Sequence, residues 1–222
     1  MHVRFAGGLH YDPTSRRACI EFMKTLSAES KPVLVAVEWD SGIVAKLEAE
    51  REDFKRRWAR FREQDPPELV EQLAKSIAWE SDVFKDVFGD LPVVWLEDGR
   101  GEPPSTRPLG SNRRLDCEYA LAPDPKERPT ADVLPRLHRY WLEDAEVTQK
   151  KLIEDGRDSS RDKAWEKNLA PSLDKDGWAL VIVGAIHASD WDDETLFNLL
   201  IAGGHRCDAG FLVWKPTPPT KK

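Results

Sequence analysis

The chain has 222 residues, and its 33 lysines and arginines against 40 aspartates and glutamates leave a formal net charge of −7. This length suits one domain with a sizeable core, and an acidic chain without a basic stripe is a poor partner for nucleic acids or anionic membrane surfaces. The longest nearly unbroken apolar stretch, residues 178–186, is too short to span a bilayer, and residues 1–10 contain no run of signal-peptide length. The three cysteines are scattered without a CxxC motif, which argues against a disulfide framework and favours a reduced, cytoplasmic setting.

The first half of the chain alternates apolar runs with segments of helical periodicity. Residues 33–37 are five consecutive apolar residues, which is typical of a strand buried on both faces. Cys19, Phe22 and Met23 recur at intervals that place them on one helical face. The predicted strands cover 3–6, 33–37 and 91–96, and the predicted helices follow Asp12, cover 43–62 and run from residue 67 to about 88.

The second half begins with two segments rich in glycine and proline, 98–112 and 121–135, which are predicted loops. Helices are predicted over 136–154, 161–169 and 195–201, strands over 178–183 and 211–214, and a disordered tail over 215–222. The alternation predicts an α/β fold, with a single domain over residues 1–214 and a mainly parallel central sheet flanked by helices. The last strand could remain an edge, so the oligomeric state stays open.

Two histidines follow predicted strands in the same way. His10 comes three residues after Gly7, and His187 comes three residues after Gly184. Ligands of parallel α/β folds bind outside the carboxyl ends of the strands, so both histidines are expected at one rim of the sheet. The two glycines are expected to let the backbone turn sharply there. Trp191 is predicted to begin a helix and to cover this rim.

Acidic and basic residues end the other two core strands. Glu38 and Asp40 follow the second strand and, being two residues apart, are expected to face the same side. Asp98 and Arg100 follow the third strand. A single histidine or acid at a strand end is most often structural, but the repeated strand–GxxH unit and the acid-ended strands favour a functional site.

These residue types allow two kinds of hydrolytic chemistry. Two imidazoles with a carboxylate can hold a divalent metal such as Mn, Co or Zn, and an open coordination position would activate a water molecule. Without a metal, a histidine oriented by Glu38 could act as a general base on water. Both interpretations use His10, Glu38 and His187.

These motifs also resemble the TraB/PrgY, Tiki, ChaN and erythromycin-esterase superfamily, whose members carry two GxxH motifs and a glutamate after the second strand. Residues 96–100, LEDGR, look like the third strand of that superfamily with its acidic residue and arginine. The pattern Arg161-Asp162-x-x-Trp165-x-x-x-Leu169 is similar to the helix that precedes the last GxxH. Residues 101–135 match no part of the superfamily that we can name.

The resemblance implies an α/β domain in which His10, Glu38 and His187 form the core of the site, with Arg161 as a charge partner or oxyanion stabiliser. It makes Asp162 a secondary candidate, together with Asp40, Asp98 and Arg100. A metal-dependent, peptidase-like hydrolase is the first expectation, acting on a small molecule or a peptide. A metal-free esterase with a histidine base is the second. A haem-binding protein of the ChaN type without catalysis is the third, with Tyr11 as a possible axial ligand.

Overall fold

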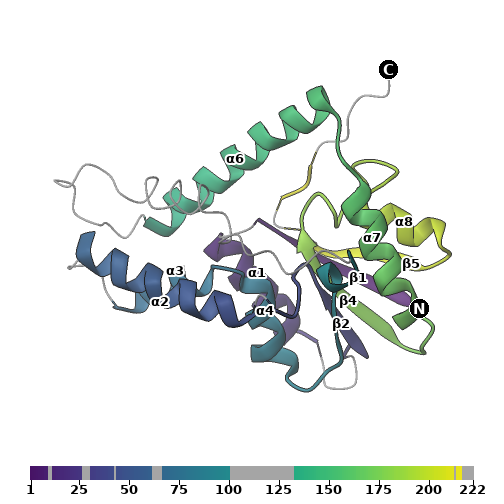
Figure 1. Cartoon of the computed structure of the whole chain (residues 1–222), viewed down its shortest axis with the longest axis horizontal. Coiled ribbons are helices and arrows are strands. Elements are labelled where there is room, and N and C mark those ends of the chain that lie inside the picture. Colours follow the sequence, from purple (N-terminus) through teal and green to yellow (C-terminus); the bar gives the residue numbers. More distant parts are fainter. Residues whose placement is uncertain are drawn as a thin grey trace.

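The computed structural model describes residues 1–9, 12–26, 31–42, 44–61, 67–100, 133–212 and 214–216. The described strands form one five-stranded, all-parallel sheet in the order β3-β2-β4-β1-β5 (Figure 1). The strands are β1 (His2–Gly8), β2 (Leu34–Val37), β3 (Val93–Trp95), β4 (Trp178–Gly184) and β5 (Arg206–Leu212). The predicted α/β class and the parallel sheet are confirmed.

Seven α-helices lie within the described residues, and none of these is both long and apolar enough to cross a membrane. They are α1 (Pro13–Lys24), α2 (Val44–Phe61), α3 (Pro67–Lys75), α4 (Trp79–Val83), α6 (Val133–Asp155), α7 (Ser160–Leu169) and α8 (Leu196–Ala202). A π-helical turn (Phe84–Phe88) follows α4, and 3-10 turns cover Leu96–Arg100 and Ala170–Ser172.

Three predicted elements differ from the structure. The single helix expected over 67–88 is interrupted between α3 and α4, where Ala78 adopts a φ of 50° that no α-helix accommodates. The last strand begins at Arg206 rather than residue 211, because β5 is a half-exposed edge strand whose polar residues hide the strand pattern. Trp191 lies in a turn and is buried, while α8 begins only after Thr195, whose hydroxyl accepts the Asn198 N–H.

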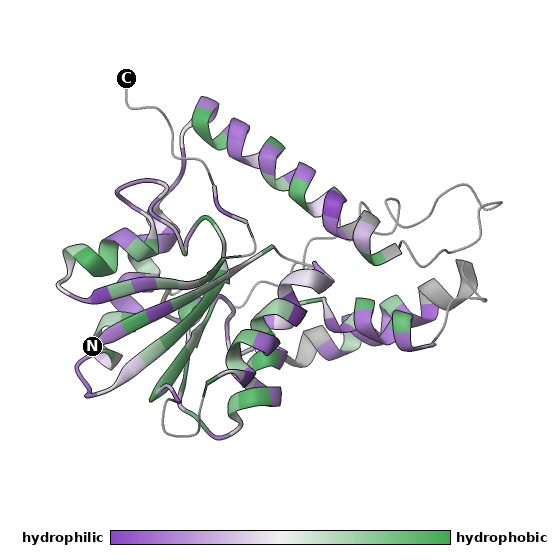
Figure 2. Ribbon diagram, turned by 180° about the vertical axis from the view of Figure 1, so that it is seen from behind, coloured by the Kyte–Doolittle hydropathy of each residue, from purple (hydrophilic) through white to green (hydrophobic). Residues whose placement is uncertain are grey.

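The sheet is covered on both faces, as the five-residue apolar run of the second strand predicted. Alternate residues of β2 and β4 point to opposite faces. One set packs on α1 and the α4 region, and the other packs on α7 and α8. Right-handed crossovers explain this division, since the chain moves from β1 to β3 through the first helices and returns to β5 through the last (Figures 1 and 2).

Helix α6 lies beyond the carboxyl ends of the strands rather than on a face of the sheet (Figure 1). A separate apolar cluster joins Trp141 and Ala145 of α6 to Leu9, Phe54 of α2 and Leu73 of α3. Figure 2 shows hydrophobic and hydrophilic residues alternating along α6. The helix is thus anchored through Trp141 and Ala145 and spans the rim at which the functional residues were predicted.

The glycines before the first GxxH histidine lie inside β1 and do not form a turn. Gly7 and Gly8 are the last two residues of the strand, in register with Val183 and Gly184 of β4. A Cβ on Gly7 would lie 2.9 Å from the Ala188 Cβ, and a Cβ on Gly8 would overlap the buried Trp79 indole. Close packing against the strand, rather than backbone freedom, therefore requires glycine at both positions.

Candidate functional site

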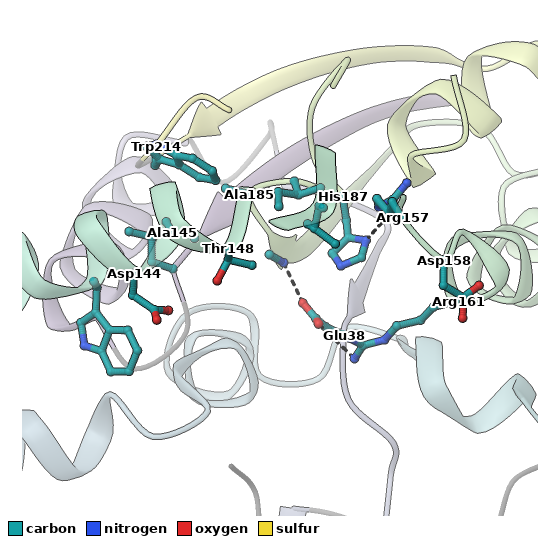
Figure 3. Close-up of a pocket in the computed structure, with 16 residues that line it drawn as sticks. Glu38, Asp144, Ala145, Thr148, Arg157, Asp158, Arg161, Ala185, His187 and Trp214 are labelled. Carbon is teal, nitrogen blue, oxygen red and sulfur yellow. Dashed lines mark hydrogen bonds and ion pairs between the residues drawn. The ribbon is translucent and has the colours of Figure 1, made fainter. Parts of the chain in front are cut away.

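A pocket of about 350 Å³ opens at the carboxyl ends of β1, β2 and β4 (Figure 3). This is where the chain changes its direction of travel across the sheet, the usual ligand position in such folds. Gly8, Glu38 and the turn from Gly184 to His187 form the floor. Helix α6, residues 157–161 and Trp214 form the walls.

The turn after β4 brings His187 into the pocket. The Ala185 N–H donates to the Gly8 carbonyl at 3.0 Å, which continues the pairing of β4 with β1 by one residue. The His187 N–H then donates to the Gly184 carbonyl at 3.0 Å and closes a tight turn. The imidazole therefore projects from the edge of the sheet toward the space above Glu38 and Arg161 (Figure 3).

His187 forms a dyad with Asp162, the secondary candidate on α7. Nδ1 lies 2.9 and 3.0 Å from the two carboxylate oxygens of Asp162, which is fully buried. The carboxylate also accepts the Leu196 N–H at 2.7 Å, and the imidazole rests against the Trp165 ring with centroids 4.8 Å apart. An Asp that accepts from Nδ1–H fixes the tautomer in which Nε2 is free to take a proton.

Arg157 is a site residue that the sequence analysis missed. Its side chain is 7% exposed, contacts the carboxylate of Asp162, and donates to Asp192 at 3.0 and 3.1 Å. Its guanidinium also lies 3.3 Å from Nδ1 of His187. Arg157 lies in the connection between α6 and α7, four residues before Arg161. This spacing was the only feature of the sequence that could have indicated Arg157 as a site residue.

Glu38 is 2% exposed and holds two neighbours at the end of β2. Its Oε2 accepts the Gly184 N–H at 2.7 Å, which ties β2 to the turn that carries His187. Its Oε1 lies 3.0 Å from Nη2 of Arg161. Glu38 and Arg161 thus lie together at the pocket (Figure 3).

Arg161 is held between two acids and an indole. Its Nε lies 2.5 Å from Glu97, which also accepts the Trp165 indole N–H at 3.1 Å, and its guanidinium lies over the Trp165 ring. Burial lowers the pKa of Arg161, but the charges of Glu38 and Glu97 outweigh burial and raise that pKa above its usual range. The guanidinium of Arg161 is therefore a permanent positive charge in the lining of the pocket.

The remaining secondary candidates are Asp40, Asp98 and Arg100. Asp98 accepts the Ser41 N–H at 2.8 Å, so Glu97 rather than Asp98 is the acid of this segment that reaches Arg161. Asp40 is 8% exposed, and its Oδ1 has no hydrogen-bond partner among the described residues. The side chain of Arg100 lies outside the described part of the structure.

The wall contributed by α6 is a second feature that the sequence analysis missed. Its lining residues follow one face of the helix at intervals of three and four: Trp141, Asp144, Ala145, Thr148 and Leu152. With Leu9, Ile186 and Trp214 they make much of the lining apolar. The spacing was visible in the sequence, but the charged residues between these positions led to the prediction of a polar helix.

The predicted metal set is only partly within the described residues. His10, and Tyr11 as the possible haem ligand, lie outside them. Both oxygens of Glu38 and the Nδ1 of His187 are already engaged by protein groups. Within the part of the chain that the structure describes, no three His, Cys, Asp or Glu side chains form a group that could hold a metal ion. The divalent metal and the haem therefore stay predictions that depend on His10 and Tyr11.

Comparisons of the chain with protein-family models, with curated proteins and with solved structures found no match. The resemblance to the TraB/PrgY, Tiki, ChaN and erythromycin-esterase superfamily therefore stays a prediction from its motifs.

Proposed function

We propose that this protein is a hydrolase of small ester or amide substrates, and that His187 is its general base. The observation that carries the proposal is the buried Asp162, which binds Nδ1 of His187 and leaves Nε2 on the side of the pocket. This is the metal-free, esterase-like alternative of the sequence analysis, with one change. The residue that orients the imidazole is Asp162, whereas Glu38 holds Arg161 and the turn after β4.

In the proposed reaction, Nε2 of His187 takes a proton from a water molecule as the water oxygen attacks the substrate carbonyl carbon. Asp162 stabilises the imidazolium that forms, since the carboxylate is fixed by Arg157 and by the Leu196 N–H. Arg161 faces the pocket and carries five N–H donors, of which the contacts with Glu38 and Glu97 use two. Its other donors are available to the oxyanion of the tetrahedral intermediate.

The shape of the pocket supports a substrate with an apolar part. A volume of about 350 Å³ lies within the range typical of small-molecule sites, and Trp141, Leu152 and Trp214 contribute apolar surface to the lining. A small molecule or the side chain of a peptide would fit this description. The polar end, with Arg161 and His187, would hold the scissile ester or amide group.

Replacement of the proposed base tests the function. His187→Gln should lower kcat/KM for 4-nitrophenyl butyrate by about 10²–10⁴-fold, because general base catalysis contributes this much. Asp162→Asn should cause a loss of similar size, because the amide cannot hold the same tautomer. His205→Gln is the matched control, since His205 lies in the turn before β5, away from the pocket. Full activity in His187→Gln would refute the proposal.

Removal of metal separates the proposal from the metal-dependent alternative. Activity should persist after dialysis against a strong chelator, because His187 and Asp162 supply the base without a metal. Loss of activity on chelation, with recovery on addition of Mn, Co or Zn, would instead support the metal-dependent, peptidase-like hydrolase. Metal content of the dialysed protein, measured by mass spectrometry, is the accompanying control.

A further inference from the structure

The two arginines that line the pocket are each held by two carboxylates. Arg161 lies 3.0 Å from Glu38 and 2.5 Å from Glu97, and Arg157 likewise contacts two aspartates. Asp158 adds a further negative charge to the lining. The guanidiniums thus keep N–H donors for an oxyanion, but their positive charges are already balanced. An anionic group of a substrate would therefore find no excess positive charge among the described lining residues.

Asp144 of α6 is an acid of the lining whose charge is not balanced in this way. Its side chain is half-buried and lines the pocket. Within the part of the chain that the structure describes, it has no hydrogen bond or ion pair. The helix positions three and four residues away carry no lysine or arginine, so α6 itself supplies no counter-charge. A cation of the ligand could supply it.

The position of Asp144 in the pocket suits a group remote from the reacting bond. Asp144 lies at one side of the pocket and Arg161 at the other, with His187 between them in the view of Figure 3. Trp214 is on the same side as Asp144 (Figure 3). A substrate with its ester group at His187 and Arg161 would extend its other end toward Asp144.

Two tryptophans accompany Asp144 in the lining. Trp141 precedes it by three residues and so lies on the same face of α6, and Trp214 comes from the segment after β5. The face of an indole ring attracts cations, and aromatic side chains are the usual partners of quaternary ammonium groups. Such a group also exposes methyl groups, which suit an apolar lining. One carboxylate with two indoles therefore fits an ammonium group better than it fits a neutral or anionic one.

We infer that Asp144 determines the substrate class of this site by binding a cationic, alkylated ammonium group of the ester. This inference rests on the proposed hydrolase function and adds the chemistry of the non-reacting end of the substrate. Asp144 supplies the negative charge, and Trp141 and Trp214 supply aromatic surface. Asp144 acts in binding and takes no part in the proton transfers at His187.

Two esters that differ only in charge test the inference. Butyrylcholine carries a trimethylammonium group, and 3,3-dimethylbutyl butyrate has a carbon atom in place of the nitrogen. The wild type should hydrolyse butyrylcholine with a kcat/KM about ten-fold or more above that of the neutral ester, because a carboxylate and indole faces attract the cation. Titration of the released acid measures both reactions. A ratio near one in the wild type would overturn the inference.

Asp144→Asn keeps the size of the side chain and removes its charge. It should lower the ratio of kcat/KM for butyrylcholine to kcat/KM for the neutral ester by about ten-fold. Glu143→Gln is the matched control, since Glu143 is adjacent and exposed and does not line the pocket. This variant loses the same charge but should keep the ratio of the wild type. An equal change in both variants would assign the preference to the general charge of the protein and overturn the role of Asp144.

A binding measurement separates this inference from the proposed function. Choline should bind the wild type more tightly than the neutral 3,3-dimethylbutan-1-ol does, and Asp144→Asn should weaken choline binding by about ten-fold in calorimetric titrations. Equal affinities of choline for the wild type and Asp144→Asn, or no choline binding, would overturn the inference. If choline binds as expected but the wild type hydrolyses neither ester, the proposed function alone fails.

Discussion

At the scale of single residues, the last two positions of β1 are decided by what packs on them. Gly8 is paired with Gly184 and faces Trp79, one of the largest fully buried side chains. The absence of a side chain lets the indole approach the strand directly beneath the pocket floor. Gly8 therefore contributes both to the packing of the core and to the floor of the pocket.

Gly8→Ala should destabilise the protein by about 1–3 kcal/mol, the usual cost of overfilling a packed core, because the new methyl group would overlap the Trp79 indole. Urea denaturation followed by circular dichroism measures the free energy of unfolding. Gly203→Ala is the matched control, since a Cβ at Gly203 has only ordinary contacts of 3.5 Å or more and its φ is negative. Equal stability of the two variants would contradict this account of Gly8.

Glu38 has a structural task that can be separated from its charge. Glu38→Ala leaves the buried Gly184 N–H without an acceptor, which should cost about 1–3 kcal/mol of folding free energy. Glu38→Gln keeps an acceptor for that N–H and removes only the charge that faces Arg161, so it should cost less. Thermal denaturation of both variants gives the comparison, and equal losses in the two variants would show that the ion pair with Arg161, which both remove, dominates.

At the scale of elements, α6 combines anchoring with pocket formation. Trp141 and Ala145 pack with α2 and α3 and also line the pocket, which Thr148 and Leu152 continue to line further along the helix. A helix that crosses the carboxyl ends of the strands can alter substrate preference without disturbing the sheet. The opposite faces of α6 should therefore respond differently to added bulk.

Thr148→Trp should raise KM for 4-nitrophenyl butyrate or lower kcat/KM by about ten-fold or more, because the indole would occupy part of the substrate pocket. Val147→Trp is the matched control, since Val147 is adjacent and 51% exposed on the outer side of the helix. Steady-state kinetics of the two variants checks the prediction. Equal kinetics would indicate that this face of α6 does not contact the substrate.

At the scale of the whole molecule, the two ends of the described chain are joined in one sheet. The first strand, β1, lies between β4 and β5. Both of its pairing partners therefore come from the last part of the described chain. The two core clusters on the faces of the sheet each contain residues from both halves of the chain. Neither half can bury its apolar surface without the other.

Unfolding in urea should therefore follow one cooperative transition. Far-UV circular dichroism reports on the helices and sheet, and fluorescence reports on the nine tryptophans, so the two probes sample the structure differently. Their midpoints should coincide. Separate transitions would contradict the single domain and would indicate that the α6 region unfolds independently of the sheet.

Local patterns in the sequence determined the secondary structure closely where an element is buried and regular. The apolar run at 33–37 and the intervals of Cys19 and Met23 predicted β2 and α1, because burial on a defined face imposes a period that the sequence must follow. Glu38 and the GxxH unit that ends in His187 were also expected at strand ends, because the ends of apolar runs and the glycines can be located in the sequence alone. The edge strand β5 was placed too late because half-exposed residues are under weaker constraint.

Only the tertiary structure decided which side chains are partners. His187 binds Asp162 rather than Glu38, Glu97 rather than Asp98 reaches Arg161, and the contacts of Arg157 could not be predicted. The pairing of His138 with Asp12 joins two elements 126 residues apart. Periodicity records how one segment faces the core, but a hydrogen bond between distant segments depends on the register of the sheet and the crossing of α6, which no local pattern encodes.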